Sequence, residues 1–325
     1  MNFAHILKEI GAGGGGPRDL PAAAAQQLYA AMLDGGVPDL ELGAILLALR
    51  IKGESLPELL GFHQALTDRL YRLQPPGGDV RTVVIPTYDG AQSRPNLLPL
   101  VALLLQRMNV PVLLHGTLEG HGRVASAYIL RDLGILPSGT LAQAQEALDR
   151  EKLAFVPTAV LSPGLANLLS LRSRLGVRSS AHLLARLIDP FGGASLRLAS
   201  VSHPAYLEKL RQFFLATGDA AIVMPGTEGE AYANPQKRPR IELCRDGEAQ
   251  LLFEEEHAAT PPPEAQDLEA KATAAWIRKA MDGGAALPLP MVNQLACILY
   301  GAGYTSDFNQ AKAIVAVETR SFAAA

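Results

Sequence analysis

The sequence predicts an α/β fold with two parts, a small helical domain and a larger domain with a central, mainly parallel sheet. Residues 3–72 carry only helical periodicity, whereas from Arg81 onward short apolar runs alternate with helical stretches. A strand, a helix and a second strand in succession form a parallel unit, so this alternation indicates a parallel sheet. We expect the helical domain to cover residues 1–75, with a helical contribution from about 163–186, and the α/β domain to cover residues 76–325.

Three long helices are expected in the first part of the chain. Residues 21–35 and 38–53 combine strong helix formers with apolar residues at helical spacing, and each run ends at glycine. The third helix is expected over residues 55–73. It begins with Ser55 in the N-cap position and Glu58 three residues later, which is the pattern of a capping box.

Five runs in the second part predict strands, because each is short, apolar and bounded by proline, glycine or polar residues. These runs are residues 81–86, 110–116, 152–158, 196–203 and 220–226. Residues 257–266 contain three consecutive prolines and predict a linker before a final helical segment.

The composition excludes several classes of protein. With 48% hydrophobic and 19% charged residues, the chain is too apolar for intrinsic disorder to dominate. No apolar run reaches the roughly 18 residues that a membrane helix needs, and the N-terminus lacks an apolar signal core. The two cysteines, Cys244 and Cys297, have no spacing typical of a disulfide framework or a zinc site. We therefore expect a cytoplasmic protein with no membrane partner and no metal site.

The charge is distributed unevenly along the chain. The net charge of −3 argues against a polyanionic partner. However, residues 152–218 contain eight lysines and arginines against two acids, whereas residues 241–325 contain twelve acids against six bases. Such an asymmetry fits either an ordinary solvated surface or a functional face.

Three segments carry a resemblance to a known family. They are residues 32–66, with Asp34-Gly35 and the run 49–55 (LRIKGES); residues 113–135, with His115-Gly116; and the arginine-rich residues 171–190. Together they resemble glycosyltransferase family 3, the fold shared by anthranilate phosphoribosyltransferase and the pyrimidine nucleoside phosphorylases. The resemblance implies a small helical domain, a large α/β domain of the nucleoside phosphorylase and phosphoribosyltransferase class, and a homodimer formed through the helical domain.

The sequence departs from that family at its three phosphate and metal elements. The glycine-rich turn that approaches pyrophosphate reads Ile85-Pro86-Thr87-Tyr88-Asp89-Gly90, in which proline lacks a donor and tyrosine adds bulk. The Asn-x-Ser-Thr element aligns with residues 96–99 and has lost both hydroxyls. The Asp-Glu pair that holds magnesium aligns with residues 231–232, Ala-Tyr, although the nearby Glu228 and Glu230 leave a metal-binding alternative.

Other positions still match the family pattern. These vestigial positions are Asp89, Gly90, Asn96, His115, Gly116, Arg123 and Ser126. His115 either orients a substrate or completes a strand end. Because phosphoribosyl transfer depends on metal and backbone donors around pyrophosphate, the losses predict no catalytic residue and no cofactor. The alternative is a phosphoribosyl or glycosyl transferase with an altered substrate, which also has Arg172 in its favour and would require Mg²⁺.

A family 3 scaffold that has lost its metal carboxylates and gathered arginines resembles the YbiB-type paralogues. This resemblance implies a homodimer that binds nucleic acid, single- or double-stranded DNA, without strong sequence preference. The expected phosphate contacts come from two groups of cations: Arg172, Arg174, Arg178 and Arg186, and Lys237, Arg238 and Arg240. A purely structural or regulatory dimer is a third possibility.

Local features refine this expectation. Helical spacing places Arg174 and Arg178 on one face. Residues 234–240 (NPQKRPR) are expected to form a semi-rigid basic prong held by two prolines, with an ordinary solvated loop as the alternative. Tyr88 and Tyr232 are the aromatic residues that we consider as base-stacking platforms.

Overall fold

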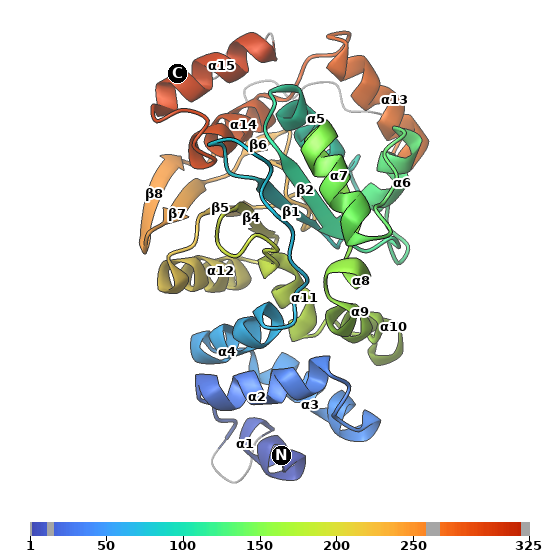
Figure 1. Cartoon of the computed structure of the whole chain (residues 1–325), viewed down its shortest axis with the longest axis vertical. Coiled ribbons are helices and arrows are strands. Elements are labelled where there is room, and N and C mark those ends of the chain that lie inside the picture. The colour runs from blue at the N-terminus through green and yellow to red at the C-terminus, as the bar shows by residue number, and fades with distance from the viewer. Residues whose placement is uncertain (1, 12–15, 258–266, 320–325) are drawn as a thin grey trace. The chain divides into compact units, whose positions relative to one another are not determined.

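The computed structural model describes residues 2–11, 16–257 and 267–319. The chain divides into two compact units, a helical unit of Met1–Arg72 and Thr158–Pro190 and an α/β unit of Leu73–Pro157 and Phe191–Ala325. Figure 1 labels most of the helices and strands of each unit. The fold class predicted from the sequence is confirmed. From residue 258 onward, the expected linker lies outside the described residues.

Two stretches of chain build the helical unit. The first supplies α1 (Phe3–Ile10), α2 (Ala22–Leu33), α3 (Asp39–Lys52) and α4 (Leu56–Thr67). The second supplies α8 (Thr158–Leu161), α9 (Pro163–Ser170), α10 (Arg172–Leu175), α11 (Ser180–Leu184) and the 3-10 turn Ala185–Leu187. Helices α2 and α4 pack closely because Gly61 lacks a side chain: a Cβ there would lie 2.2 Å from the Ala22 carbonyl oxygen.

The start of α4 confirms the predicted capping box. The Ser55 amide donates to Glu58 Oε2 at 2.8 Å, and the Glu58 amide donates to Ser55 Oγ at 3.4 Å. The buried Glu58 carboxylate also accepts from the Leu20 amide and from Lys52 Nζ. One glutamate therefore fixes the start of α4 and ties it to two other segments of the unit.

The arginine-rich stretch is not one helix. Helix α10 ends at Leu175 and is capped by Gly176, which has φ +71°, a left-handed conformation that glycine adopts without steric cost. Arg178 lies after this break and outside any helix. The expectation that Arg174 and Arg178 share a helical face is therefore wrong.

A seven-stranded sheet forms the centre of the α/β unit, in the order β3-β2-β1-β4-β5-β7-β8. The five predicted strands are confirmed and run parallel, and β7 and β8 extend the sheet antiparallel. The sheet strands are β1 (Val83–Thr87), β2 (Val112–Gly116), β3 (Leu153–Pro157), β4 (Leu196–Val201), β5 (Ala221–Pro225), β7 (Ile241–Arg245) and β8 (Glu248–Phe253). A separate pair consists of β6 (Lys237–Arg238) and β9 (Glu256–His257).

Helices cover both faces of this sheet. They are α5 (Leu98–Arg107), α6 (Ser126–Asp132), α7 (Leu141–Glu151), α12 (Pro204–Thr217), α13 (Ala270–Met281), α14 (Leu289–Gly301) and α15 (Phe308–Glu318). Alternate strand residues such as Val83 and Ile85 share one buried cluster with α5, α13 and α14. On the opposite face, the Arg197 guanidinium lies 4.7 Å from the centre of the Phe214 ring of α12.

The strand order reverses between β1 and β4, whose neighbours continue in opposite directions across the sheet. In parallel sheets, the loops that follow the carboxyl ends of strands at such a reversal form the usual ligand crevice. A site is therefore expected at the loops after β1 and β4, next to the loop after β5, which is the parallel neighbour of β4. None of the helices within the described ranges combines the length and apolar character that a bilayer span requires.

Candidate functional site

The turn after β1, residues 88–93, is held in a fixed shape. Gly90 has φ +64°, and a Cβ there would lie 2.9 Å from the Val124 carbonyl oxygen. The Ala91 and Val124 backbones exchange hydrogen bonds of 3.0 and 2.8 Å. This turn directs a set of backbone N–H groups toward the loop that follows β5.

Glu230, in the loop after β5, accepts two of these N–H groups. Its Oε1 atom lies 2.8 Å from the Asp89 amide nitrogen and 2.7 Å from that of Gly90. The Glu230 side chain is fully buried, and its Oε2 atom lies 3.5 Å from Ser126 Oγ. A carboxylate of this chain therefore lies where the turn would otherwise bind an anion.

Glu228 accepts the next two N–H groups of the same turn. The Gln92 amide donates to one oxygen at 2.9 Å and the Ser93 amide donates to the other at 3.0 Å. Arg123 pairs with this carboxylate at 2.8 Å and donates from Nε to the Gly90 carbonyl. Four donors of the turn and one guanidinium are thus satisfied by two glutamates.

The loop that carries these glutamates is tightly constrained. Glu228 has φ +53° and Gly229 has φ +96°. A Cβ on Gly229 would lie 1.9 Å from Asp89 Oδ2, so only glycine fits beside that carboxylate. Tyr232, fully buried, donates from its hydroxyl to the Pro95 carbonyl at 2.9 Å and anchors the far end of the loop.

This environment shifts the pKa of the Glu230 carboxyl group. Burial raises its pKa above the ordinary range, and the neighbouring Asp89 charge raises it further. The hydrogen bonds from the backbone of Gly90 and Asp89 act in the opposite direction, because they favour the ionised form. The loss of solvation outweighs these donors, so protonation of Glu230 is easier here than in water.

The structure brings most of the vestigial positions together around these contacts. Asn96 donates to the Val124 carbonyl and to Ser126 Oγ, both at 3.1 Å, and accepts from the Leu98 amide at the start of α5. Ser126 also accepts from Thr87 at 2.8 Å. Asp89, Gly90, Asn96, Arg123 and Ser126 thus belong to one network.

His115 and Gly116 lie at the end of β2, beside the same turn. His115 is fully buried, and its Nδ1 atom lies 2.9 Å from the Tyr88 hydroxyl. A Cβ on Gly116 would lie 1.8 Å from the Thr87 carbonyl oxygen, so this glycine permits close approach of β1 and β2. Tyr88 is 6% exposed and Tyr232 fully buried. The expectation that these tyrosines serve as base-stacking platforms is therefore wrong.

The residues present do not fit the magnesium ion that the resemblance implies. Ala231 and Tyr232 occupy the pair position, and both are buried without a carboxylate. Both oxygens of Glu228 and Oε1 of Glu230 hold backbone amides, and the remaining Oε2 of Glu230 lies buried beside Ser126. One such oxygen falls short of the octahedral set of ligands that a magnesium ion requires. Among the described residues, no group of three or more His, Cys, Asp or Glu side chains is placed to hold a metal.

The segment Lys237–Arg240, here called the basic segment, is ion-paired. Lys237 pairs with Glu255 at 2.6 Å and Arg238 with Glu256 at 2.5 Å, and Arg240 bridges Glu242 and Glu254 at 3.0 and 2.8 Å. Strand β6 also hydrogen-bonds to β9, which carries Glu256. The prediction of a basic prong is therefore wrong, because the carboxylates of residues 254–256 neutralise the positive charges of this segment.

The other predicted cations, Arg172, Arg174 and Arg178, here called the arginine segment, have a different environment. Arg174 is exposed and lies 3.7 Å from Asp39, which is itself exposed. Arg172 and Arg178 are half-buried, and within the described part of the chain Arg172 forms no ion pair. Arg186 is only 5% exposed, so we remove it from the expected surface contacts.

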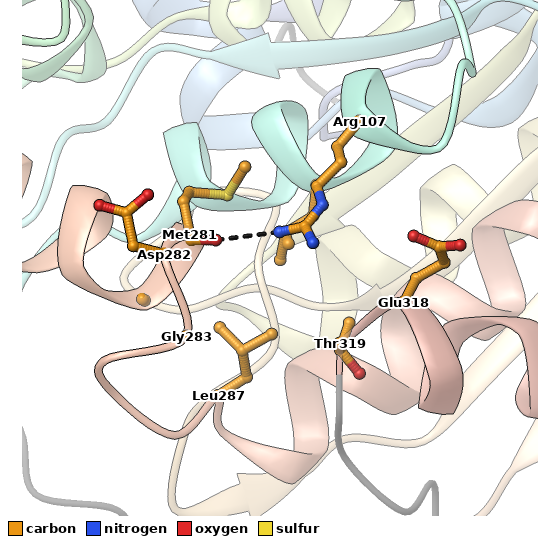
Figure 2. Close-up of a pocket in the computed structure, with 9 residues that line it drawn as sticks. Arg107, Met281, Asp282, Gly283, Leu287, Glu318 and Thr319 are labelled. Atoms are coloured by element: carbon orange, nitrogen blue, oxygen red, sulfur yellow. Dashed lines mark hydrogen bonds between the residues drawn. The ribbon is translucent and has the colours of Figure 1, made fainter.

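A small hollow elsewhere in the α/β unit does not qualify as a site. Figure 2 shows Arg107 of α5 donating to the Met281 carbonyl beside Leu287 and Glu318. Its volume is about 40 Å³, far below the roughly 300–1,000 Å³ of typical ligand pockets. We assign it no function.

Sequence reasoning missed the role of Glu228 and Glu230. It compared residues 231–232 with the lost carboxylate pair and considered the two glutamates only as metal ligands. The two glutamates just before that pair were the available signal. The partner of each, the amides of the turn after β1, lies about 140 residues away and has no sequence signature.

Comparisons with known proteins agree with the geometry of the fold. Residues 4–69 match the helical bundle domain of the glycosyl transferase family. The protein YbiB of Escherichia coli K12 is 43% identical over 318 residues, which cover 97% of this chain and 99% of YbiB. The anthranilate phosphoribosyltransferase of Methanosphaerula palustris is 27% identical over 315 residues, which cover 95% and 92% of the two chains.

Solved structures give the same fold at lower identity. The anthranilate phosphoribosyltransferase of Thermus thermophilus superposes with a TM-score of 0.76 at 22% identity, covering 99% of this chain and 95% of that one. The anthranilate phosphoribosyltransferase of Saccharomyces cerevisiae in complex with PRPP and Mg superposes with a TM-score of 0.72 at 13% identity, covering 98% of this chain and 93% of that one. These likenesses establish the scaffold.

Proposed function

The chain belongs to the glycosyl transferase family 3 proteins of the YbiB type, and from this premise we propose that it is a non-catalytic homodimer that binds nucleic acid. Its scaffold is that of an anthranilate phosphoribosyltransferase. The proposal has two parts, the absence of phosphoribosyl transfer and the binding of a polyanion, and a different region of the chain supports each part.

The observation that carries the first part is the filled turn after β1. Transfer from a pyrophosphate-bearing substrate needs donors and a metal ion that stabilise the departing anion. Here Glu228 and Glu230 accept the N–H groups of Asp89, Gly90, Gln92 and Ser93. An incoming phosphate would have to displace two carboxylates, and their negative charge would repel it until it did so.

The arginine segment supports the second part. From residue 152 to 188 the chain contains no acid, and the carboxylate that meets Arg174, that of Asp39, lies 3.7 Å away with both side chains exposed. An exposed pair of this kind offsets little of the positive charge of the segment. Contacts of such cations with phosphates gain free energy from counterion release and need no particular base sequence. We therefore propose a sequence-tolerant contact with the nucleic acid backbone.

The exposed face of α3 supports a homodimer. Leu40 and Ile51 are 82% and 78% exposed, and Leu47 is exposed between them. Residues 40, 47 and 51 follow helical spacing and make one apolar stripe, which a second copy of the chain would cover. A Cβ on Gly43 of α3 would lie 3.9 Å from Leu175, so the arginine segment lies beside this helix. A dimer formed here would bring two arginine segments to the edges of one interface.

The test is fluorescence anisotropy of a labelled single-stranded oligonucleotide across a salt series. We expect binding at about 50 mM salt that weakens steeply as salt rises, because each neutralised phosphate releases counterions. The triple variant R172Q/R174Q/R178Q is expected to lose most of this binding. Undetectable binding of the wild type at about 50 mM salt would overturn the proposal. A duplex of the same sequence, tested in parallel, compares single- and double-stranded DNA.

A second candidate is a transferase with an altered substrate. It is favoured by the shared network of Asp89, Gly90, Asn96, Arg123 and Ser126, which keeps the family positions in contact. Calorimetry with phosphoribosyl pyrophosphate and Mg²⁺ decides between the candidates. Heat of binding at millimolar ligand would support the transferase, and its absence would leave the nucleic acid function.

A further inference from the structure

Strand β8 forms one end of the seven-stranded sheet, so β7 pairs with one of its edges and the other edge is free. Figure 1 shows β8 as the outermost strand beside β7. The strand at the opposite end, β3, is covered: residues 153–156 are buried, and the Phe155 carbonyl accepts from the Ser138 amide at 2.7 Å. A free edge presents backbone donors and acceptors to which a further strand can add.

The hairpin that joins β7 to β8 shows which backbone groups face outward. Its two turn residues, Asp246 and Gly247, have φ +54° and +81°, which is typical of a two-residue type I′ turn. The residues that flank such a turn exchange hydrogen bonds, and bonded and non-bonded pairs alternate from there along the ladder. The N–H and C=O groups of Ala249 and Leu251 therefore face away from β7. Within the described residues, no backbone hydrogen bond reaches these outward groups.

A hollow adjoins the free edge on one face of the hairpin. Its volume is about 160 Å³, and it is lined by Leu243, Arg245, Asp246, Glu248, Ala249 and Gln250. The Tyr300 hydroxyl donates to Gln250 Oε1 at 3.3 Å and holds one wall. Because side chains alternate along a strand, Leu251, which is 40% exposed, lies on the opposite face. The hollow is smaller than the roughly 300–1,000 Å³ of small-molecule pockets, so it suits one side chain of a peptide.

The charges at this edge favour a basic partner. Asp246 and Glu248 are both exposed at the hollow, whereas the one cation there, Arg245, lies 3.7 Å from Asp246. Glu248 has no ion-pair partner among the described residues. A second copy of the chain suits the edge less well. Pairing Ala249 of one copy with residue 251 of the other would place Asp246 opposite residue 254, which is also a glutamate.

We propose that the free edge of β8 binds an extended segment of a partner protein, with basic side chains toward Asp246 and Glu248 and apolar side chains toward Leu251. In this mode of recognition, backbone hydrogen bonds supply affinity, and pockets for alternate side chains supply specificity. The same acids disfavour a phosphate backbone at this edge. The proposal does not rest on nucleic acid binding, so either proposal can fail without the other.

The test is a calorimetric titration of the full chain with a short peptide in which lysine and valine alternate. In an extended peptide, this alternation places the lysines on one face and the valines on the other. A peptide of the same composition, with all lysines before the valines, is the control. We expect the alternating peptide to bind about 10-fold more tightly. Equal affinities, or no heat with millimolar alternating peptide, would overturn the proposal.

Two variants separate the backbone contribution from the charge contribution. A249P removes an outward N–H group and places its ring in the path of an added strand, but it removes no hydrogen bond to β7. We expect it to weaken binding of the alternating peptide about 10-fold. D246N/E248Q removes the acids of the hollow and keeps the turn, because asparagine also tolerates positive φ. We expect a similar loss, with a weaker dependence on salt.

The matched control is E146Q/D149N, which removes two exposed acids from α7. It is expected to bind the alternating peptide as the wild type does. Equal losses in this variant and in D246N/E248Q would contradict the proposal, because the attraction would then be a property of net charge.

Amide hydrogen exchange of the wild type keeps the test decisive if A249P does not fold. Saturation with the alternating peptide is expected to slow exchange at Ala249 and Leu251, because their amides become hydrogen-bonded. Binding without slower exchange there would overturn the proposal. So would self-association of the wild type that A249P abolishes, because the edge would then hold a second copy of the chain.

Discussion

The arginine segment and the basic segment look alike in the sequence, and the structure separates them. Each places three cations within seven residues or fewer. In the basic segment, Lys237, Arg238 and Arg240 pair with the run 254–256 and with Glu242 at 2.5 to 3.0 Å. In the arginine segment, Arg174 lies 3.7 Å from Asp39, with both side chains exposed. Local density of positive charge therefore does not identify an anion-binding surface, because a distant acidic run can neutralise it.

The same distinction applies to the turn after β1. Its donors would suit a phosphate, but Glu228 and Glu230 already satisfy them. The donors of the turn and the charges of the basic segment thus both have partners within the chain. The proposed nucleic acid contact is therefore assigned to the arginine segment, in which Arg174 pairs with a carboxylate that is itself exposed.

The largest expected effect comes from giving the arginine segment acids of its own. Ser173 and Val177 are exposed between the three arginines, and S173E/V177E would place carboxylates beside them. We expect a loss of oligonucleotide affinity of about 100-fold at low salt, because internal pairs then compete with phosphate contacts. Anisotropy measures this loss. The uncharged variant S173Q/V177Q is the control, and an equal loss in both would contradict the electrostatic account.

The reverse change is expected to have a smaller effect. E254Q/E255Q/E256Q removes the acids that face the basic segment and leaves its cations in place. We expect affinity for the oligonucleotide to rise about 10-fold, with a steeper salt dependence, because newly unpaired cations are available to phosphates. A titration at two salt concentrations measures both. Unchanged affinity would indicate that the basic segment never meets the nucleic acid.

A third prediction concerns pH and the internally satisfied turn. Because the pKa of Glu230 is raised above its ordinary value of 4.5, the folded state binds a proton more readily than the unfolded state. Stability should therefore fall as pH rises from about 4.5 toward the folded pKa, by at most about 1.4 kcal/mol per pH unit. Urea unfolding across this range measures the slope. E230Q should reduce this dependence of the unfolding free energy on pH. An unchanged slope in E230Q would show that another group causes the pH dependence.

The smallest expected effect is that of neutralising the basic segment. Each cation of the basic segment has an exposed carboxylate partner, and surface pairs of this kind contribute about 0.2–1 kcal/mol each. K237Q/R238Q/R240Q should therefore lower the free energy of unfolding by about 1–2 kcal/mol. Its affinity for the oligonucleotide should stay within about threefold of the wild type. Chemical denaturation and anisotropy give the two values. A large loss of affinity here would restore the basic prong that the sequence alone suggested.

Much of the fold can be predicted from the sequence, because the residue patterns that specify its helices and strands are local. The capping box at Ser55 and Glu58, and the five short apolar runs that became β1 to β5, follow from spacing and residue type. The break at Gly176 was missed, since a single glycine within a helical pattern has no fixed consequence. The sequence therefore predicts one helix through Arg174 and Arg178, whereas the real helix ends before Arg178.

The site is harder to predict from the sequence, because its contacts join residues that are far apart along the chain. The vestigial positions were found through the resemblance, but the pairing of Glu230 with the Asp89 and Gly90 amides depends on how β1 and β5 lie in the sheet. The pairing of Arg238 with Glu256 likewise depends on the β6 and β9 strands, which are two residues each. The charges of Arg238 and Glu256 are visible in the sequence, but their positions along the chain do not indicate that they meet.

The most direct test of the central claim is the slope of log affinity against log salt for the wild type, R172Q/R174Q/R178Q and K237Q/R238Q/R240Q, with one single-stranded oligonucleotide. Each phosphate contact that is lost reduces the slope by about 1. The account predicts a reduction of up to about 3 in the first variant and a slope close to that of the wild type in the second. The opposite order, with the basic segment controlling the slope, would contradict it.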